Sequence, residues 1–123
     1  MPVGPAELGG PYGHEKLAPI LSLFTVANLE ECLALCKRIL EQEGLGHTAI
    51  IHTRSDALAR QFGLEMPASR ILVNVSGAGG CIGIGTGLTP PFTLGCGSYG
   101  GNPTTDNVTC TRLLNIKRLA QGT

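Results

Sequence analysis

The chain has 123 residues, 42% of them hydrophobic and 15% charged, so it is long enough for one globular domain and too apolar to be disordered. Nine basic and nine acidic residues cancel, which argues against a nucleic-acid or anionic-membrane partner, because both are recognised by excess positive charge. No apolar run is long enough to span a bilayer, and the first residues lack the pattern of a secretory signal, so we expect a cytoplasmic protein.

The first third of the chain predicts an arm, a strand and a helix. Residues 1–13 are rich in proline and glycine and should form an irregular arm. Apolar residues dominate the run from Ile20 to Val26, which predicts a buried strand. Asn28 and Glu31 have the spacing of a capping box, and apolar residues then recur at helical intervals until glycines at 44 and 46.

Two further strands with a helix between them follow. Residues 47–53 are rich in β-branched side chains and predict a strand. Ser55 can cap a helix over residues 56–65, which Pro67 closes, and residues 71–73 predict the next strand. Alternation of strands and helices at these lengths is typical of an α/β fold, with a mostly parallel sheet flanked by helices in three layers.

A glycine-rich segment comes next, with ten glycines among the 25 residues from Gly77 to Gly101. Residues 95–100 match the pattern GxGxxG of dinucleotide-binding proteins. That reading needs a helix that starts inside the motif and an acidic residue about 20 positions later, whereas Pro103 follows and Asn115 stands at the second place. We therefore interpret the motif as structural turns, with a phosphate-binding nest in a small nucleotide-binding protein as an alternative.

The five cysteines do not form a recognisable reactive or metal-binding set. Cys32 and Cys36 lie on the apolar face of the predicted helix, where small buried side chains are usual. Cys81 and Cys96 lie in glycine-rich backbone, but no fixed base accompanies them. We expect structural roles for these cysteines, and we assign no catalytic residue and no metal ligand.

Several segments, taken in order, resemble a known family: HEKLAPIL, GHTAIIHT, RILVN, TLGCGSYGGN and LLNIKRLA. They resemble the C-terminal part of the CoA-acylating aldehyde dehydrogenases, including the aldehyde half of aldehyde–alcohol dehydrogenases, and the likeness runs from about Gly10 onward. The resemblance implies a reaction in which a cysteine attacks an aldehyde, hydride passes to NAD or NADP, and coenzyme A takes the acyl group. None of the five cysteines falls at the nucleophile's place, so the resemblance implies a fragment that is inactive alone.

The resemblance also implies roles for individual residues. Without the resemblance, Glu15 is interpreted as a solvated charge, and His47 is interpreted either as a pocket residue or as a histidine bonded to nearby backbone. By resemblance, Glu15 binds the nicotinamide ribose and His47 lies near the nicotinamide. The residues that follow the RILVN strand, Asn74, Val75 and Ser76, line the aldehyde channel.

The expected organisation is an arm at 1–13, a catalytic-domain fragment at 14–112 and a last segment at 113–123. The sequence LLNIKRLA in that last segment fits an edge strand or a helix. The resemblance implies a strand that pairs with a partner subunit and so makes a homo-oligomer. A different function class, a non-catalytic assembly module that uses this exposed edge, remains an alternative.

Overall fold

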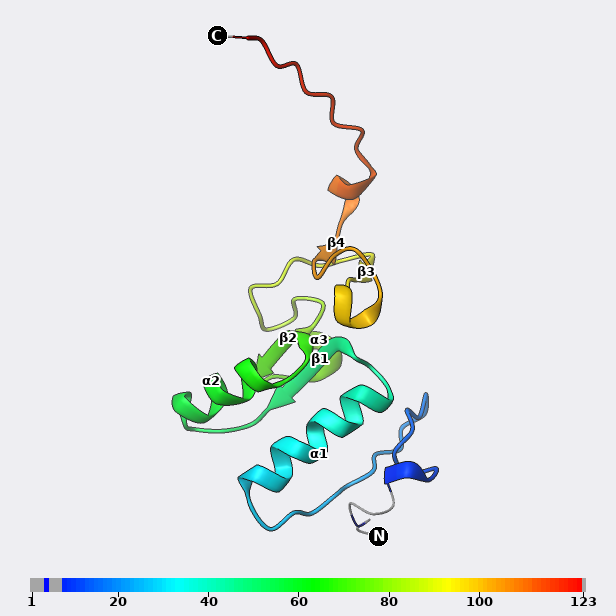
Figure 1. Cartoon of the computed structure of the whole chain (residues 1–123), viewed down its shortest axis with the longest axis vertical. Coiled ribbons are helices and arrows are strands. Elements are labelled where there is room, and N and C mark those ends of the chain that lie inside the picture. Colours follow the sequence, from blue (N-terminus) through cyan, green and yellow to red (C-terminus); the bar gives the residue numbers. More distant parts are fainter. Residues whose placement is uncertain (1–3, 5–7, 123) are drawn as a thin grey trace.

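The computed structural model describes Gly4 and residues 8–122 of the chain (Figure 1). Its centre is a pair of parallel strands, reached in the order helix, strand, helix, strand. These elements are α1 (Leu29–Gln42), β1 (Gly46–Ile51), α2 (Asp56–Glu65) and β2 (Ala68–Val73). The strands pair from Gly46 opposite Ala68 to Ile51 opposite Val73. The expected α/β class is therefore present, and helix α2 connects the two parallel strands.

Local signals set the limits of α1. The Asn28 side chain accepts a hydrogen bond from the backbone N–H of Glu31 at 3.0 Å, and the Glu31 carboxylate accepts one from Ala27 N at 2.9 Å. These two bonds form a capping box, except that the Glu31 carboxylate binds the backbone N–H of Ala27, one residue before the N-cap Asn28. Helix α1 ends shortly before Gly44, whose φ is +96°. The predicted helix is confirmed.

The second helix and its flanking strands are also confirmed, with shifted limits. Helix α2 has the predicted bounds, and the Ser55 hydroxyl caps it by accepting from Leu58 N at 3.3 Å. Strand β1 occupies residues 46–51, and β2 begins at Ala68, three residues earlier than predicted. The helices and one face of the sheet enclose the main core, which consists of Leu33, Leu40, Ala49, Phe62 and Met66.

The predicted strand at residues 20–26 is wrong. Only Phe24 forms an isolated bridge there, and Leu21 is 90% exposed. A strand exists only where a neighbouring backbone satisfies its N–H and C=O groups, and no other described segment pairs along this run. The described chain therefore has two parallel strands where the sequence predicted three. Of the predicted arm, residues 1–3 and 5–7 lie outside the described part, and residues 8–13 form turns.

The opposite face of the sheet carries the glycine-rich segment. A side chain at Gly77 would meet Ile50 and one at Gly80 would meet Leu72, so α3 (Gly77–Gly80) lies close against both strands. The remaining elements are β3 (Thr93–Leu94), η2 (Ser98–Gly100), β4 (Asn107–Val108) and η3 (Cys110–Leu113). Strands β3 and β4 pair antiparallel. This small unit sits above the sheet in Figure 1.

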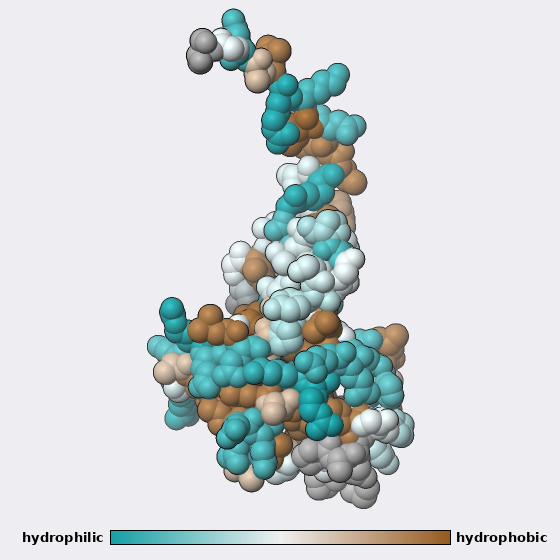
Figure 2. Space-filling view, in the orientation of Figure 1, coloured by the Kyte–Doolittle hydropathy of each residue, from teal (hydrophilic) through white to brown (hydrophobic). Residues whose placement is uncertain are grey.

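Residues 114–122 have neither helix nor strand and are exposed throughout. Figure 1 shows them running away from the body of the molecule, and Figure 2 shows apolar side chains along that extension. Leu113, Leu114, Ile116 and Leu119 are among the exposed large apolar residues. The helical interpretation of this segment is not supported, whereas pairing with a partner subunit stays a prediction.

Candidate functional site

The two predicted cofactor residues, Glu15 and His47, line one cavity of about 600 Å³. Glu15 comes from the irregular segment that precedes α1, and His47 is the second residue of β1. The end of α1 closes the cavity between them with Ile39 and Leu40. The cavity therefore combines an apolar wall with several polar groups, which is the usual composition of a small-molecule site.

Glu43 holds the segment around Glu15 in place. Its carboxylate contacts His14 Nδ1 at 2.6 Å and accepts a hydrogen bond from the backbone N–H of Glu15. These contacts, the Glu15 N–H first and the His14 ring second, hold the pKa of Glu43 below its ordinary value. Lys16 Nζ donates to the carbonyls of Tyr12 at 2.9 Å and His14 at 2.6 Å.

The Glu15 carboxylate itself makes no hydrogen bond or ion pair within the described part of the chain. An ionised carboxylate has only acceptor sites, and it can accept two hydrogen bonds at once. Two neighbouring hydroxyl groups, such as those of a ribose, match that capacity. The Glu15 carboxylate can therefore accept from a pair of neighbouring hydroxyl groups on a small molecule.

His47 lies at the edge of β1, with its ring Nδ1 2.9 Å from the hydroxyl oxygen of Thr48. The ring is bonded to a side chain and not to nearby backbone. Partial burial lowers the pKa of His47, and the positive charge of Arg70 lowers it further, while Glu15 acts in the opposite direction. A neutral imidazole carries one N–H donor and one acceptor nitrogen.

The three predicted channel residues, Asn74, Val75 and Ser76, lie elsewhere. Asn74 adopts a φ of +56°, and its side chain accepts from Thr53 N at 2.9 Å and donates to Thr53 O at 2.8 Å. Val75 packs beside Gly80, and Ser76 is exposed ahead of α3. Among the described residues none of the three lines the cavity that Glu15 and His47 share, so their role in an aldehyde channel stays a prediction.

The GxGxxG match forms turns, as predicted. Residues 98–100 are one short 3-10 turn, so no α-helix begins inside the motif. The Asn102 side chain accepts from Cys96 N at 2.9 Å and from Gly97 N at 3.0 Å. Backbone carbonyls accept from the N–H groups of residues 100–102. Because these donors are already bonded within the chain, the segment is a poor phosphate-binding nest.

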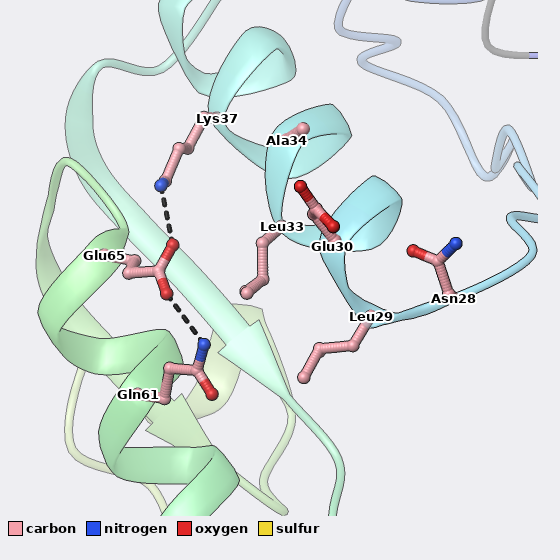
Figure 3. A pocket seen from close by; sticks show the side chains of 8 residues that line it. All are labelled: Asn28, Leu29, Glu30, Leu33, Ala34, Lys37, Gln61 and Glu65. Carbon is pink, nitrogen blue, oxygen red and sulfur yellow. Dashed lines mark hydrogen bonds and ion pairs between the residues drawn. The ribbon is translucent and has the colours of Figure 1, made fainter.

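A second hollow lies between α1 and α2 (Figure 3). Lys37 Nζ contacts a Glu65 oxygen at 2.7 Å, and Gln61 donates to the other oxygen at 2.9 Å. Leu29 and Leu33 extend from α1 into the same space (Figure 3). Lys37 and Glu65 join the two helices and Gln61 holds the same carboxylate from within α2, which fits a stabilising contact better than a ligand site.

Cys36 and Cys81 both lie away from full solvent exposure. Burial, together with the neighbouring Cys32 thiol, raises the pKa of Cys36 to about 11. Cys81 is buried, and its thiol lies 3.4 Å from the Ala78 carbonyl oxygen. Within the described residues no three His, Cys, Asp or Glu side chains gather as a metal site would require. None of the described helices has both the length and the apolar character to cross a bilayer.

Sequence reasoning missed three residues that shape the site: Glu43, Thr48 and Arg70. Glu43 looks like an ordinary charge at the end of a helix, and Thr48 looks like an ordinary strand residue. Arg70 could have been singled out from the sequence, because it directly precedes the apolar triplet of a strand. An arginine there lies either at the end of the strand or in a buried position with hydrogen-bond partners. The structure shows the second case, with Arg70 only 4% exposed.

No family model matches the chain. The aldehyde-alcohol dehydrogenase 2 of Entamoeba histolytica is 44% identical over 119 residues, which is 96% of this chain and 13% of that protein. The acetylating succinate-semialdehyde dehydrogenase of Clostridium kluyveri is 37% identical over 85% of this chain and 23% of its own length.

Solved structures agree with the sequence relatives. A probable aldehyde dehydrogenase from Listeria monocytogenes is 48% identical with a TM-score of 0.85, over 92% of this chain and 25% of that one. An acetylating aldehyde dehydrogenase from Geobacillus thermoglucosidasius is 44% identical with a TM-score of 0.86, over the same shares. The chain thus spans a quarter or less of the proteins named here. Because sequence and fold agree along nearly all of its length, the chain is homologous to a segment of the acetylating aldehyde dehydrogenases and the aldehyde-alcohol dehydrogenases.

Proposed function

We propose that the chain is the C-terminal portion of the catalytic domain of a CoA-acylating aldehyde dehydrogenase. The complete enzyme converts an aldehyde, coenzyme A and NAD or NADP into an acyl-CoA and the reduced cofactor. The nucleophilic cysteine lies upstream of the matched region, so this chain alone is inactive. In the complete enzyme the two parallel strands belong to a larger, mostly parallel sheet that is flanked by helices, which makes three layers.

The observation that carries the proposal is the shared cavity of Glu15 and His47 in a chain whose relatives are acetylating dehydrogenases. Glu15 accepts hydrogen bonds from the two hydroxyl groups of the nicotinamide ribose. His47 supplies a hydrogen bond close to the nicotinamide. The cofactor, when bound, supplies the hydride acceptor, and Asn74, Val75 and Ser76 border the aldehyde's path.

Cofactor binding tests this assignment directly. We expect NAD at millimolar concentration to shift the amide signals of Glu15 and His47 in NMR spectra of the chain, because only part of the cofactor site is present. Glu15→Gln removes the charge that accepts the ribose hydroxyls and should weaken the shifts, whereas Glu30→Gln, an exposed acid on α1, should leave them unchanged. Shifts confined to the hollow between α1 and α2, or none at any concentration, would contradict the assignment.

Activity provides the second test. We expect no reduction of NAD when the chain is mixed with acetaldehyde and coenzyme A. Sustained turnover that survives replacement of each cysteine in the chain would not fit a missing thiol nucleophile. Sustained turnover that one cysteine variant abolishes would identify a nucleophile in this chain, and would refute the proposal equally.

The exposed residues 114–122 support a role in oligomerisation, since an apolar segment with unpaired backbone N–H and C=O groups can pair with a strand of another chain. A variant that ends at Leu113 should sediment as a smaller species than the whole chain. Its thermal unfolding should be unchanged, because residues 114–122 are exposed throughout. Identical sedimentation of the two forms as monomers at high concentration would refute this role.

A further inference from the structure

Arg70 is a buried arginine that has no acidic partner among the residues the structure describes. Its Nη2 donates to the Gly95 carbonyl at 2.7 Å and its Nη1 to the Thr105 carbonyl at 3.2 Å. The ion pairs of the described chain, which join His14 to Glu43, Lys37 to Glu65 and Arg112 to Asp106, do not include it. A buried charge is costly unless it is paired and fully hydrogen-bonded. Arg70 is bonded only to neutral acceptors, so its positive charge acts on its surroundings without local compensation.

The guanidinium reaches the candidate site through Thr48. Arg70 Nε donates to the Thr48 hydroxyl oxygen at 3.2 Å, and the same oxygen lies 2.9 Å from His47 Nδ1. An arginine can only donate, so Thr48 is the acceptor in the first bond. The Thr48 hydroxyl keeps one hydrogen and a second lone pair, so it can either donate to Nδ1 of His47 or accept from it. An imidazole that accepts at Nδ1 is neutral and carries its proton on Nε2.

Protonation of His47 would break this arrangement. An imidazolium would direct an N–H at an oxygen that already accepts from a guanidinium, with two positive charges nearby. The electrostatics of the ring agree, because burial and Arg70 both lower the pKa of His47. Glu15 opposes them, and the other charged or titratable groups lining the cavity are Tyr12, His14, Lys16 and Glu43. The Glu43 carboxylate is occupied by His14 and by the Glu15 N–H, so it offers His47 little compensation.

We propose that Arg70 is a positioning residue that acts through Thr48 to keep the His47 imidazole neutral, with its proton on Nε2. A neutral imidazole with a fixed N–H donor suits an uncharged oxygen, such as an amide carbonyl, better than a phosphate. This ligand class rests on the proposed cofactor cavity. The hydrogen-bonded chain from Arg70 to His47 does not, because it lies within the protein itself.

The histidine tautomer can be read directly from ¹⁵N NMR spectra of the labelled chain, without any ligand. We expect the wild-type spectra to show His47 protonated on Nε2, with Nδ1 as a hydrogen-bonded acceptor. Thr48→Ser keeps the hydroxyl and should preserve this signature, whereas Thr48→Val should lose the Nδ1 hydrogen bond. The signals of His14 and His52 in the same spectra report whether a variant has changed more than the site.

Replacement of Arg70 separates its charge from its geometry. Arg70→Gln should move the titration midpoint of His47 upward, and Arg70→Lys should hold it lower than Arg70→Gln does. If Arg70→Gln does not fold, the Thr48 pair decides the question. A wild-type ring protonated on Nδ1, or a Thr48→Val spectrum identical to wild type, would overturn the inference. Neither outcome bears on NAD binding, which the addition of NAD to the wild-type chain and to Glu15→Gln tests separately.

Discussion

Replacing Gly46 by alanine tests whether the glycine-rich segment holds the start of β1 in place. Gly46 has a φ of +78°, and a side chain there would meet the Cys96 carbonyl oxygen and lie 2.9 Å from Gly100 N. An L-residue in the left-handed region costs about 1–2 kcal/mol. Overfilling a close contact adds about 1–3 kcal/mol, because backbone atoms cannot rotate away as a side chain can. We therefore expect the free energy of unfolding to fall by about 2–5 kcal/mol.

Gly44 provides a matched control two residues earlier. Its φ is +96°, but a side chain there would have no atom within 4 Å. Gly44→Ala should therefore show the backbone strain alone, about 1–2 kcal/mol. Both substitutions restrict the unfolded chain equally, so that effect cancels in the comparison. Urea denaturation followed by circular dichroism measures both losses, and equal losses would refute the close contact between β1 and residues 96–100.

Three further predictions concern the helices and the thiols. Asn28→Ala should lower the free energy of unfolding by about 0.5–2 kcal/mol through loss of the N-cap, whereas Asn28→Asp should not; equal urea midpoints for these two variants would contradict the cap. Lys37 and Gln61 hold the pKa of Glu65 below its ordinary value. The contact therefore stabilises the fold at pH values above the ordinary pKa of a glutamate, and this stabilisation is lost as the pH falls through the lowered pKa. Urea denaturation at several pH values should therefore show that the free energy of unfolding depends less on pH for Glu65→Gln than for wild type. Identical pH profiles for the two proteins would contradict this role of Glu65. With a pKa of about 11, the Cys36 thiol should react with alkylating reagents at neutral pH far more slowly than the exposed Cys110; peptide mass mapping that finds Cys36 modified first would refute its burial.

Local patterns predicted helices α1 and α2, because the limits of a helix depend on neighbours within a few residues. The Asn28 and Ser55 caps, the apolar face of α1 and the proline at 67 are all readable in this way. Strand limits were less predictable, since a strand needs a partner that may be distant in sequence. Residues 20–26 carry the apolar content of a strand, but apart from a single bridge at Phe24 no described segment pairs with them. Strand β2 extends back to Ala68 because β1, from Gly46 onward, provides a strand with which it pairs.

The site divides in the same way. The amino-acid sequence by itself determined the family resemblance, helices α1 and α2 with their caps, and the parallel order of β1 and β2, whereas the roles of Glu15 and His47 rest on the resemblance and stay predictions. Only the tertiary structure decided that these two residues share a cavity, that Glu43 holds one of them and that Arg70 reaches the other through Thr48. The physical reason is range: caps and periodicity act between neighbours in the chain, whereas a cavity and a buried charge are defined by contacts between residues more than twenty positions apart.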